Sequence, residues 1–339
     1  MGRWGWRRPG AVLVVAAGLV AGLLAVVPSA AARELSDGTS ARGVFDHDGP
    51  YETTQTARVH PCDQGTEWGR LTSATVRSAG NHTALTCTDA FPNGTDSPAG
   101  LKFYYPSDLA DLPPQPALIW VPGITGDPGN YDFSARRWAS YGFVVVIAYD
   151  FINSDAVTTT YVGAAALAAR NRDPGSALYH RVDLSRTVVG GHSAGGGSTL
   201  QAASFPARVN RAIDPRFRVV SAIPTEPGPV AIGLTVRVPT LLLTGCNDTV
   251  VPDQSWPRLT QYPLIVRAPA YIGCARGATH FTPVDGDANT FIGITVAWLL
   301  YTTRGDPTAA RFFVGDHWLF RTDPDFDRVE RNTLADSAA

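Results

Sequence analysis

The sequence predicts an α/β fold in which a mostly parallel central sheet carries helices on both faces. Short β-branched or leucine-rich runs alternate with helical patterns along the chain, an order that is typical of parallel βαβ units. These runs are almost continuously apolar, as expected for strands that are covered on both faces. The chain has 339 residues, 44% of them hydrophobic, which suffices for one large core.

The predicted elements begin after a loop over residues 88–100, which is rich in Gly, Pro, Asn, Asp and Ser. Helices are predicted from apolar residues at helical spacing and from an alanine-rich stretch, and strands from short apolar runs. The aromatic residues after Gly305 are expected to cover the core. In chain order we expect a strand over 117–121, a helix over 131–141, a strand over 143–148, a helix over 161–172, a strand over 187–189, a helix over 198–205, strands over 218–223, 240–244 and 270–274, the last of them ending the sheet, and a helix over 290–301.

The N-terminus has the pattern of an export signal. Arg3, Arg7 and Arg8 precede an uncharged apolar stretch over 11–27, and small residues at 30–32 offer a cleavage site. The alternative is an uncleaved membrane anchor, for which the stretch is slightly short.

We therefore expect a signal peptide over 1–32, a flexible polar leader over 33–48 and a single domain over 49–339 that is secreted into the extracellular space.

Composition limits the partners of the mature chain. The net charge is −2 and the arginines are scattered, so neither a nucleic acid nor another polyanion is expected. No second segment is long and apolar enough to cross a bilayer, so no stable membrane anchor is expected after signal cleavage. We expect a monomer.

The four cysteines are Cys62, Cys87, Cys246 and Cys274. An even number of cysteines in an exported chain indicates disulfides, and three pairings are possible. Proximity along the chain favours Cys62 with Cys87 and Cys246 with Cys274. A zinc site is the alternative, but no C-x-x-C spacing is present, and no metal is expected.

The strongest chemical signal is the run from Gly191 to Gly195, with His192, Ser193 and Ala194 between the glycines. It follows a predicted strand and precedes a predicted helix, which is the context of a nucleophile elbow. Small residues at both ends allow the tight turn. Ser193 would then project at the helix N-terminus, whose partial positive charge favours a developing oxyanion. Ser193 is thus the predicted nucleophile.

A serine hydroxyl needs a base and an acid that orients the base, in the chain order Ser, then Asp or Glu, then His. His280, in a loop after the strand over 270–274, is the predicted base; the alternative, His317, lies in an aromatic C-terminal segment and is expected to pack there. Asp248 follows the strand over 240–244 and is the leading acid. Glu226, after the preceding strand, stays open as the alternative, because carboxylates at strand C-termini face the ligand crevice.

Two main-chain N–H groups are expected to form an oxyanion hole. One belongs to Ala194, directly after the nucleophile, and the other to Ile124, in a loop after the strand over 117–121. A disulfide between Cys246 and Cys274 would hold the loops of Asp248 and His280 in register. A disulfide that closes a loop of this length contributes about 3 kcal/mol to the free energy of unfolding.

The chain resembles the bacterial cutinases, lipases and polyester hydrolases, including the poly(ethylene terephthalate) hydrolases, with some features of the chlorophyllase-like branch. The resemblance implies an α/β-hydrolase fold, the triad Ser193, Asp248 and His280, and an extracellular carboxylic ester hydrolase without a cofactor. The segments that carry it run in the family's order over 49–51, 121–126, 139–145, 191–197, 248–252 and 277–283.

Three positions depart from the polyester-cleaving members. Those members usually carry an aromatic residue at the position of Ile124, Met at that of Ala194 and Trp after the strand that here ends in Ile223–Pro227. An aryl ring stacked on such a Trp gains about 1 kcal/mol, a contribution that is missing here. The expected substrate is a small-molecule or lipid-like ester, with a polyester left open. The alternatives are a thioesterase or peptidase on the same triad, and a non-catalytic binding protein.

Overall fold

A computed structural model describes residues 35–81, 83–88, 99–150 and 157–337. The predicted signal peptide and most of the predicted loop over 88–100 lie outside the described residues. Residues 36–339 form one compact unit. Among the described residues, no helix combines the length and the apolar character that a bilayer crossing requires.

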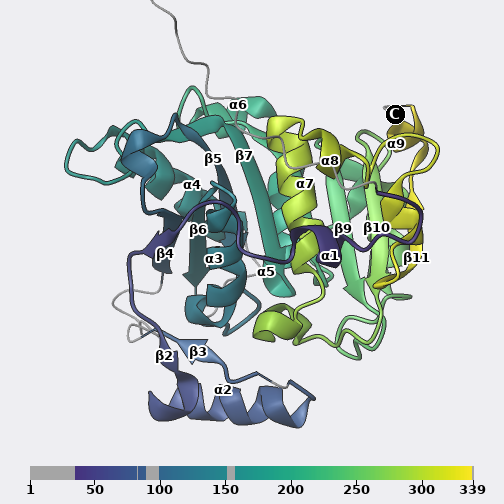
Figure 1. Ribbon diagram of the computed structural model, residues 1–339, viewed down its shortest axis with the longest axis horizontal. Coiled ribbons are helices and arrows are strands. Elements are labelled where there is room, and N and C mark those ends of the chain that lie inside the picture. Colours follow the sequence, from purple (N-terminus) through teal and green to yellow (C-terminus); the bar gives the residue numbers. More distant parts are fainter. Residues whose placement is uncertain (1–34, 82, 89–98, 151–156, 338–339) are drawn as a thin grey trace, which may run out of the picture. The chain divides into compact units, whose positions relative to one another are not determined.

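The central sheet of the described residues has nine strands in the order β1-β4-β6-β5-β7-β8-β9-β10-β11 (Figure 1). Neighbours from β6 to β10 pair in parallel, whereas β1, β4 and β11 join antiparallel at the edges. The predicted mostly parallel sheet is confirmed. Its strands are β1 (Thr53–Gln55), β4 (Ala99–Pro106), β5 (Gln115–Val121), β6 (Val144–Asp150), β7 (Val182–His192), β8 (Val219–Thr225), β9 (Thr240–Gly245), β10 (Ala270–Ala275) and β11 (Phe326–Arg331).

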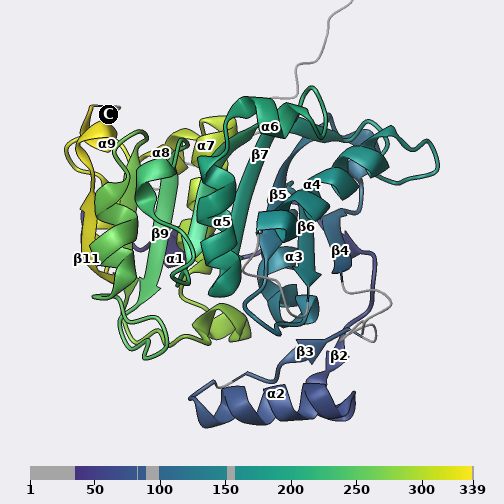
Figure 2. The ribbon, with the colours of Figure 1, turned by 180° about the vertical axis from the view of Figure 1, so that it is seen from behind.

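Helices cover both faces of the sheet, as predicted. On the face seen in Figure 1 lie α1 (Ala41–Phe45), α3 (Asp132–Ser140), α7 (Ile292–Arg304) and the short α8 (Pro307–Ala310). On the face seen in Figure 2 lie α4 (Val157–Arg172) and α5 (Ala194–Ser204), with the short α6 (Ala207–Arg211) beside them. The core is built from the fully buried strands β5 and β9 and their neighbours.

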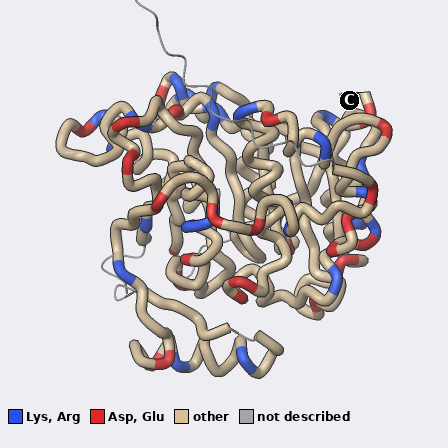
Figure 3. The backbone as a smooth tube through the Cα atoms, viewed as in Figure 1, with Lys and Arg blue, Asp and Glu red and all other residues tan. Residues whose placement is uncertain are grey.

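The remaining described elements lie outside these layers. Strands β2 (His60–Pro61) and β3 (Thr86–Cys87) pair antiparallel and flank helix α2 (Glu67–Ser78). Helix α9 (Thr333–Asp336) follows β11. Acidic and basic residues are interspersed along the described chain (Figure 3).

Two expectations about the ends of the domain are wrong. The strand over 270–274 does not end the sheet, because β11 pairs with β10 at the edge. The side chains of β11 alternate between the interior and solvent and include several charged residues. The sequence of β11 therefore lacks the apolar run of a buried strand.

The expectation of a loose leader over 33–48 is wrong for α1, which is helical and packed against the domain. Its N-cap Ser40 accepts the backbone N–H groups of Arg42 and Gly43, and Ala41 and Phe45 are buried. A Cβ at Gly293 of α7 would lie 2.6 Å from the backbone of Ala41, so the helices touch through a glycine. Because residues 33–48 are mostly polar, the sequence did not indicate that Ala41 and Phe45 would be buried.

Candidate active site

Ser193 stands in the tight turn between β7, which ends at His192, and α5, which begins at Ala194. Its backbone is left-handed, with φ 55° and ψ −118°. Such a conformation costs a non-glycine residue about 1–3 kcal/mol and is typical of functional turns. A Cβ at Gly191 would lie 2.4 Å from the Gly195 carbonyl oxygen, and one at Gly195 would lie 2.0 Å from that of Val121. Only glycine at both positions permits this turn.

Three side chains from three loops meet in one chain of hydrogen bonds. His280 Nε2 lies 2.8 Å from Ser193 Oγ, and His280 Nδ1 lies 2.7 Å from Asp248 Oδ2. The other carboxylate oxygen, Oδ1, accepts the backbone N–H groups of Val250 and Val251 at 2.7 and 2.8 Å. A carboxylate held in this way accepts the Nδ1 proton and leaves Nε2 free to accept the Ser193 proton.

The loops of Asp248 and His280 are joined by backbone and disulfide contacts. Cys246 is bonded to Cys274, and Cys62 to Cys87, so both favoured pairings are confirmed. The N–H of Asn247 also donates to the carbonyl of Ala278 at 2.9 Å. The acid and the base therefore sit on a crosslinked pair of neighbouring strands.

Glu226, the alternative acid, lies close to the same histidine. Its side chain is fully buried, its φ is 46°, and Oε2 lies 3.8 Å from His280 Nδ1. Burial, and then the neighbouring charge of Asp248, raise the pKa of Glu226 well above its ordinary value. A carboxyl group in this position favours its neutral form, which stabilises an imidazolium poorly.

His192 and Tyr131 form a second buried network beside the triad. Tyr131 Oη accepts the N–H of Gly123 at 3.0 Å and also shares a hydrogen bond with His192 Nδ1 at 2.7 Å. His192 Nε2 lies 3.2 Å from Glu226 Oε2, without meeting the angular requirement of a hydrogen bond. Burial, and then His280, lower the pKa of His192 well below its usual range, so the ring is neutral and fixes the loop of Gly123.

The predicted oxyanion donors flank Ser193. Ala194 is the first residue of α5, where helix geometry leaves the main-chain N–H without an intrahelical acceptor. Ile124 follows Gly123, whose N–H holds the loop to Tyr131. The Ile124 side chain is 59% exposed and lines the cavity next to Ser193. His317, the alternative base, is an exposed residue of the C-terminal segment.

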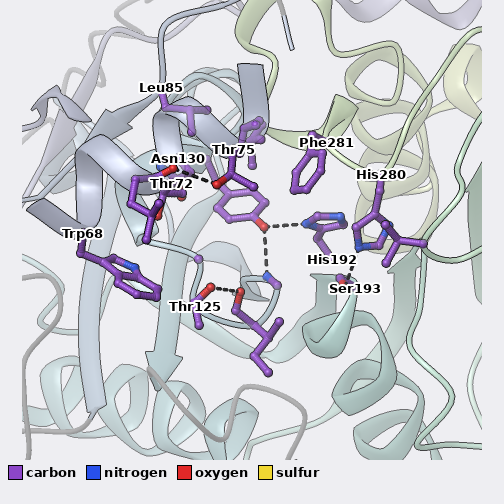
Figure 4. Close-up of a pocket in the computed structure, with 18 residues that line it drawn as sticks. Trp68, Thr72, Thr75, Leu85, Thr125, Asn130, His192, Ser193, His280 and Phe281 are labelled. Atoms are coloured by element: carbon purple, nitrogen blue, oxygen red, sulfur yellow. Dashed lines mark hydrogen bonds between the residues drawn. The ribbon is translucent and has the colours of Figure 1, made fainter. Parts of the chain in front are cut away.

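A cavity of about 380 Å³ opens onto Ser193 and His280 (Figure 4). This volume lies in the range of small-molecule sites, roughly 300–1,000 Å³. Its walls come from α2, the loop after β5 and the loop of His280. The residues that line it are Trp68, Leu71, Thr72, Thr75, Val76, Leu85, Gly123, Ile124, Thr125, Gly126, Asn130, Tyr131, His192, Ser193, Val250, His280, Phe281 and Val284.

One cluster of the described residues has the spacing of a metal site, namely His192, Glu226 and His280. The two ring nitrogens of His280 already contact Ser193 and Asp248, and His192 Nδ1 is hydrogen-bonded to Tyr131 Oη. A cation on His280 would have to displace a triad hydrogen bond, so these donors fit proton transfer better than metal binding.

The sequence reasoning missed α2, Tyr131 and His192 as parts of the site. Trp68, Leu71 and Val76 are spaced like one face of a helix after the N-cap Thr66, a signal that could have been found. The role of Tyr131 carries no local signal, because its partner His192 is 61 residues away.

The C-terminal segment stabilises the loop that follows Asp248. Buried Asp253 accepts from Thr244, Arg258 and Arg328, the last on β11. Burial alone would raise the pKa of Asp253, but these hydrogen bonds and the arginine charges outweigh it and lower the pKa. The aromatic C-terminus therefore carries a strand that supports the loop after Asp248.

Asp253→Asn is expected to lower the free energy of unfolding by about 3 kcal/mol at pH 7, because it leaves Arg258, 10% exposed, without its buried partner. A carboxyl with a lowered folded-state pKa stabilises above its unfolded pKa, and this contribution is lost as the pH falls through the folded value. The difference in free energy of unfolding between the variant and the wild type should therefore shrink below about pH 4. Urea unfolding at pH 7 and pH 3 measures it.

The matched control is Asp327→Asn, on β11 next to Arg328, whose pair with Arg276 is exposed at both ends. Solvent screens such pairs, and the expected change is below about 0.5 kcal/mol. Equal losses in both variants would contradict the structural role of Asp253.

The chain is similar in sequence to known proteins over most of its length. The family model described as PET hydrolase-like matches residues 61–322. "Cutinase 2" of Thermobifida cellulosilytica is 33% identical over 224 residues, 65% of this chain and 79% of its own length. "Cutinase cut1" of Thermobifida fusca is 33% identical over 65% of each chain. "Bis(hydroxyethyl) terephthalate hydrolase" of Streptomyces coelicolor is 29% identical over 86% of each chain.

Proposed function

The chain belongs to the PET hydrolase-like family and is a carboxylic ester hydrolase, and from this premise we propose that it is a secreted serine esterase acting through Ser193, His280 and Asp248. The observation that carries the proposal is the continuous hydrogen-bond chain from Ser193 Oγ through His280 to Asp248. The crevice at the carboxyl ends of parallel strands is where α/β folds bind ligands.

The first step is acylation. His280 Nε2 takes the Ser193 proton as Oγ attacks the ester carbonyl, and Asp248 stabilises the imidazolium through Nδ1. The N–H groups of Ile124 and Ala194 stabilise the negative oxygen of the tetrahedral intermediate. His280 then gives its proton to the departing alcohol.

The second step is deacylation. His280 takes a proton from a water that attacks the acyl-enzyme, and a second tetrahedral intermediate forms in the same oxyanion hole. Its collapse returns the proton to Ser193 Oγ and releases the carboxylic acid. The neutral His192 and Tyr131 support this cycle by holding the loop of Gly123, next to Ile124, in place.

Asp248 is the proposed acid because its carboxylate is 2.7 Å from His280 Nδ1, against 3.8 Å for Glu226. Asp248 Oδ1 also accepts the backbone N–H groups of Val250 and Val251, whereas burial favours the neutral form of Glu226. Only the charged form compensates a positive imidazole ring.

Secretion and a single catalytic domain, which includes α1 ahead of residue 49, are part of the proposal. The basic, apolar and small-residue regions within residues 1–32 support an export signal. Two disulfides within the described chain support an oxidising compartment. The proposed enzyme needs no cofactor and acts as a monomer on small or lipid-like esters, with a polyester as the alternative substrate.

A fluorophosphonate probe together with a substrate panel tests this function. We expect the probe to label Ser193, and p-nitrophenyl esters to be hydrolysed faster than matched amides and thioesters. Peptide mapping of the labelled protein identifies the modified residue. Labelling elsewhere, or amide or thioester turnover above ester turnover, would refute the proposal.

A further inference from the structure

We propose that α2 is an acyl-recognition wall, and that the cavity between α2 and Ser193 binds the aliphatic acyl chain of a small ester. This inference rests on the proposed esterase function and specifies its substrate. The helix lies beyond the carboxyl ends of the parallel strands (Figure 1) and contributes five residues to the lining of the cavity. These are Trp68, Leu71, Thr72, Thr75 and Val76.

Local sequence explains why this helix forms apart from the sheet. The N-cap Thr66 accepts the N–H of Gly69 at 3.1 Å, and Glu67 and Arg77 lie at the ends that suit their charges. A Cβ at Gly69 would lie 2.7 Å from the carbonyl of Cys62, so the glycine allows the helix to rest on its own disulfide-bonded base.

The helix is anchored to both loops that build the catalytic site. On one side, Thr88 donates its N–H and hydroxyl to the two carboxylate oxygens of Asp127, at 3.0 and 3.1 Å. On the other side, Thr83 donates its N–H to Asp285 Oδ1 at 2.8 Å. Asp127 belongs to the loop after Ile124, and Asp285 follows His280 by five residues. The chain that follows α2 is therefore held both to the loop of Ile124 and to the loop of His280.

The face that α2 turns to the cavity is chemically suited to hydrocarbon. Leu71 is 57% exposed, a large fraction for an apolar side chain beside a catalytic serine. Opposite the helix, Ile124 and Val250 are 59% and 54% exposed and line the same cavity. Apolar side chains on both walls of a small cavity gain contacts when an aliphatic chain displaces water.

The aromatic residues of the cavity do not form a stacking pair. Trp68 and Phe281 lie on opposite sides of it in Figure 4, and most of the remaining apolar lining is aliphatic. Leucine, valine and isoleucine side chains outnumber Trp68, Tyr131 and Phe281 in this lining, and a flexible chain can contact their methyl groups and those of the threonines in turn. This favours an aliphatic acyl group over an aromatic one.

The test compares kcat/KM for p-nitrophenyl octanoate with that for p-nitrophenyl acetate. A buried methylene raises the specificity constant by up to about fourfold, so the wild-type octanoate-to-acetate ratio should exceed about tenfold. Thr75→Trp fills the cavity from an exposed helix position and should bring the ratio close to one. The matched control is Ala74→Trp, on the adjacent exposed residue outside the cavity lining, which should keep the wild-type ratio.

A second pair of variants keeps the test decisive if Thr75→Trp fails to fold. Leu71→Asp places a charge on the cavity wall and should lower the ratio about fivefold, whereas Ala74→Asp should not change it. Equal ratios in wild type, Thr75→Trp and Leu71→Asp would overturn the role of α2. Faster wild-type hydrolysis of bis(hydroxyethyl) terephthalate than of the octanoate would overturn the aliphatic assignment. Loss of all ester hydrolysis in the wild type would instead refute the esterase function itself.

Discussion

Ser193→Ala is expected to lower kcat on p-nitrophenyl acetate by about 10⁵-fold or more, the scale seen when a triad serine is removed from another serine hydrolase. The nucleophile is lost, while the proposed oxyanion donors at Ile124 and Ala194 stay in place and leave a small residual rate. Alanine is smaller than serine and removes the one hydroxyl that contacts His280, so the fold should persist.

Steady-state kinetics measure the loss, and thermal unfolding shows that the variant is folded. The control is Ser198→Ala on the same helix, a buried serine whose hydroxyl donates to the carbonyl of Gly195. We expect it to retain most of the activity. A Ser193→Ala enzyme with more than about a tenth of the wild-type rate would contradict covalent catalysis at Ser193.

Asp248→Asn is expected to lower kcat about 10⁴-fold, because an amide opposite His280 Nδ1 favours the wrong imidazole tautomer. Glu226→Gln should cost less than about tenfold. Burial keeps Glu226 neutral, so a neutral amide of similar size changes little. Both variants replace a carboxyl by its amide, and each serves as the control for the other.

The comparison is made by kcat on p-nitrophenyl acetate, with folding checked by circular dichroism. A collapse of turnover in Glu226→Gln, with Asp248→Asn nearly active, would move the acid to Glu226. Similar large losses in both would indicate that the two carboxyls act as a coupled pair on His280.

Much of the fold could be predicted because its signals are local. The buried strands are continuous apolar runs such as β5 and β6, and β7 leads into a glycine-flanked serine. The antiparallel edge β11 could not be predicted in this way, since an edge strand alternates charged and apolar residues and one of its faces is solvated. Helix α2 has a local signal in its N-cap and apolar spacing, but the sequence could not show that its apolar face lines a cavity and not the sheet.

The catalytic roles were predicted from chain order, and they stay predictions. The sequence alone left Asp248 and Glu226 open, since each follows a strand and neighbouring strands lie only about 4.8 Å apart. The structure places the two carboxyls 2.7 and 3.8 Å from the same ring nitrogen. That small difference depends on loop conformation and on the bonds from Val250 and Val251.

The sequence by itself determined the order of the main strands and helices from β5 to α7, the elbow around Ser193 and the proximity of the favoured cysteine pairs. Each of these depends on residues within about one element of one another, where backbone geometry and periodicity act directly. Only the tertiary structure decided the cavity under α2, the contact of Tyr131 with His192 and the link from Arg328 to Asp253. These contacts join residues 61 or more positions apart, and their partners are chosen by packing of the whole domain, which no local pattern encodes.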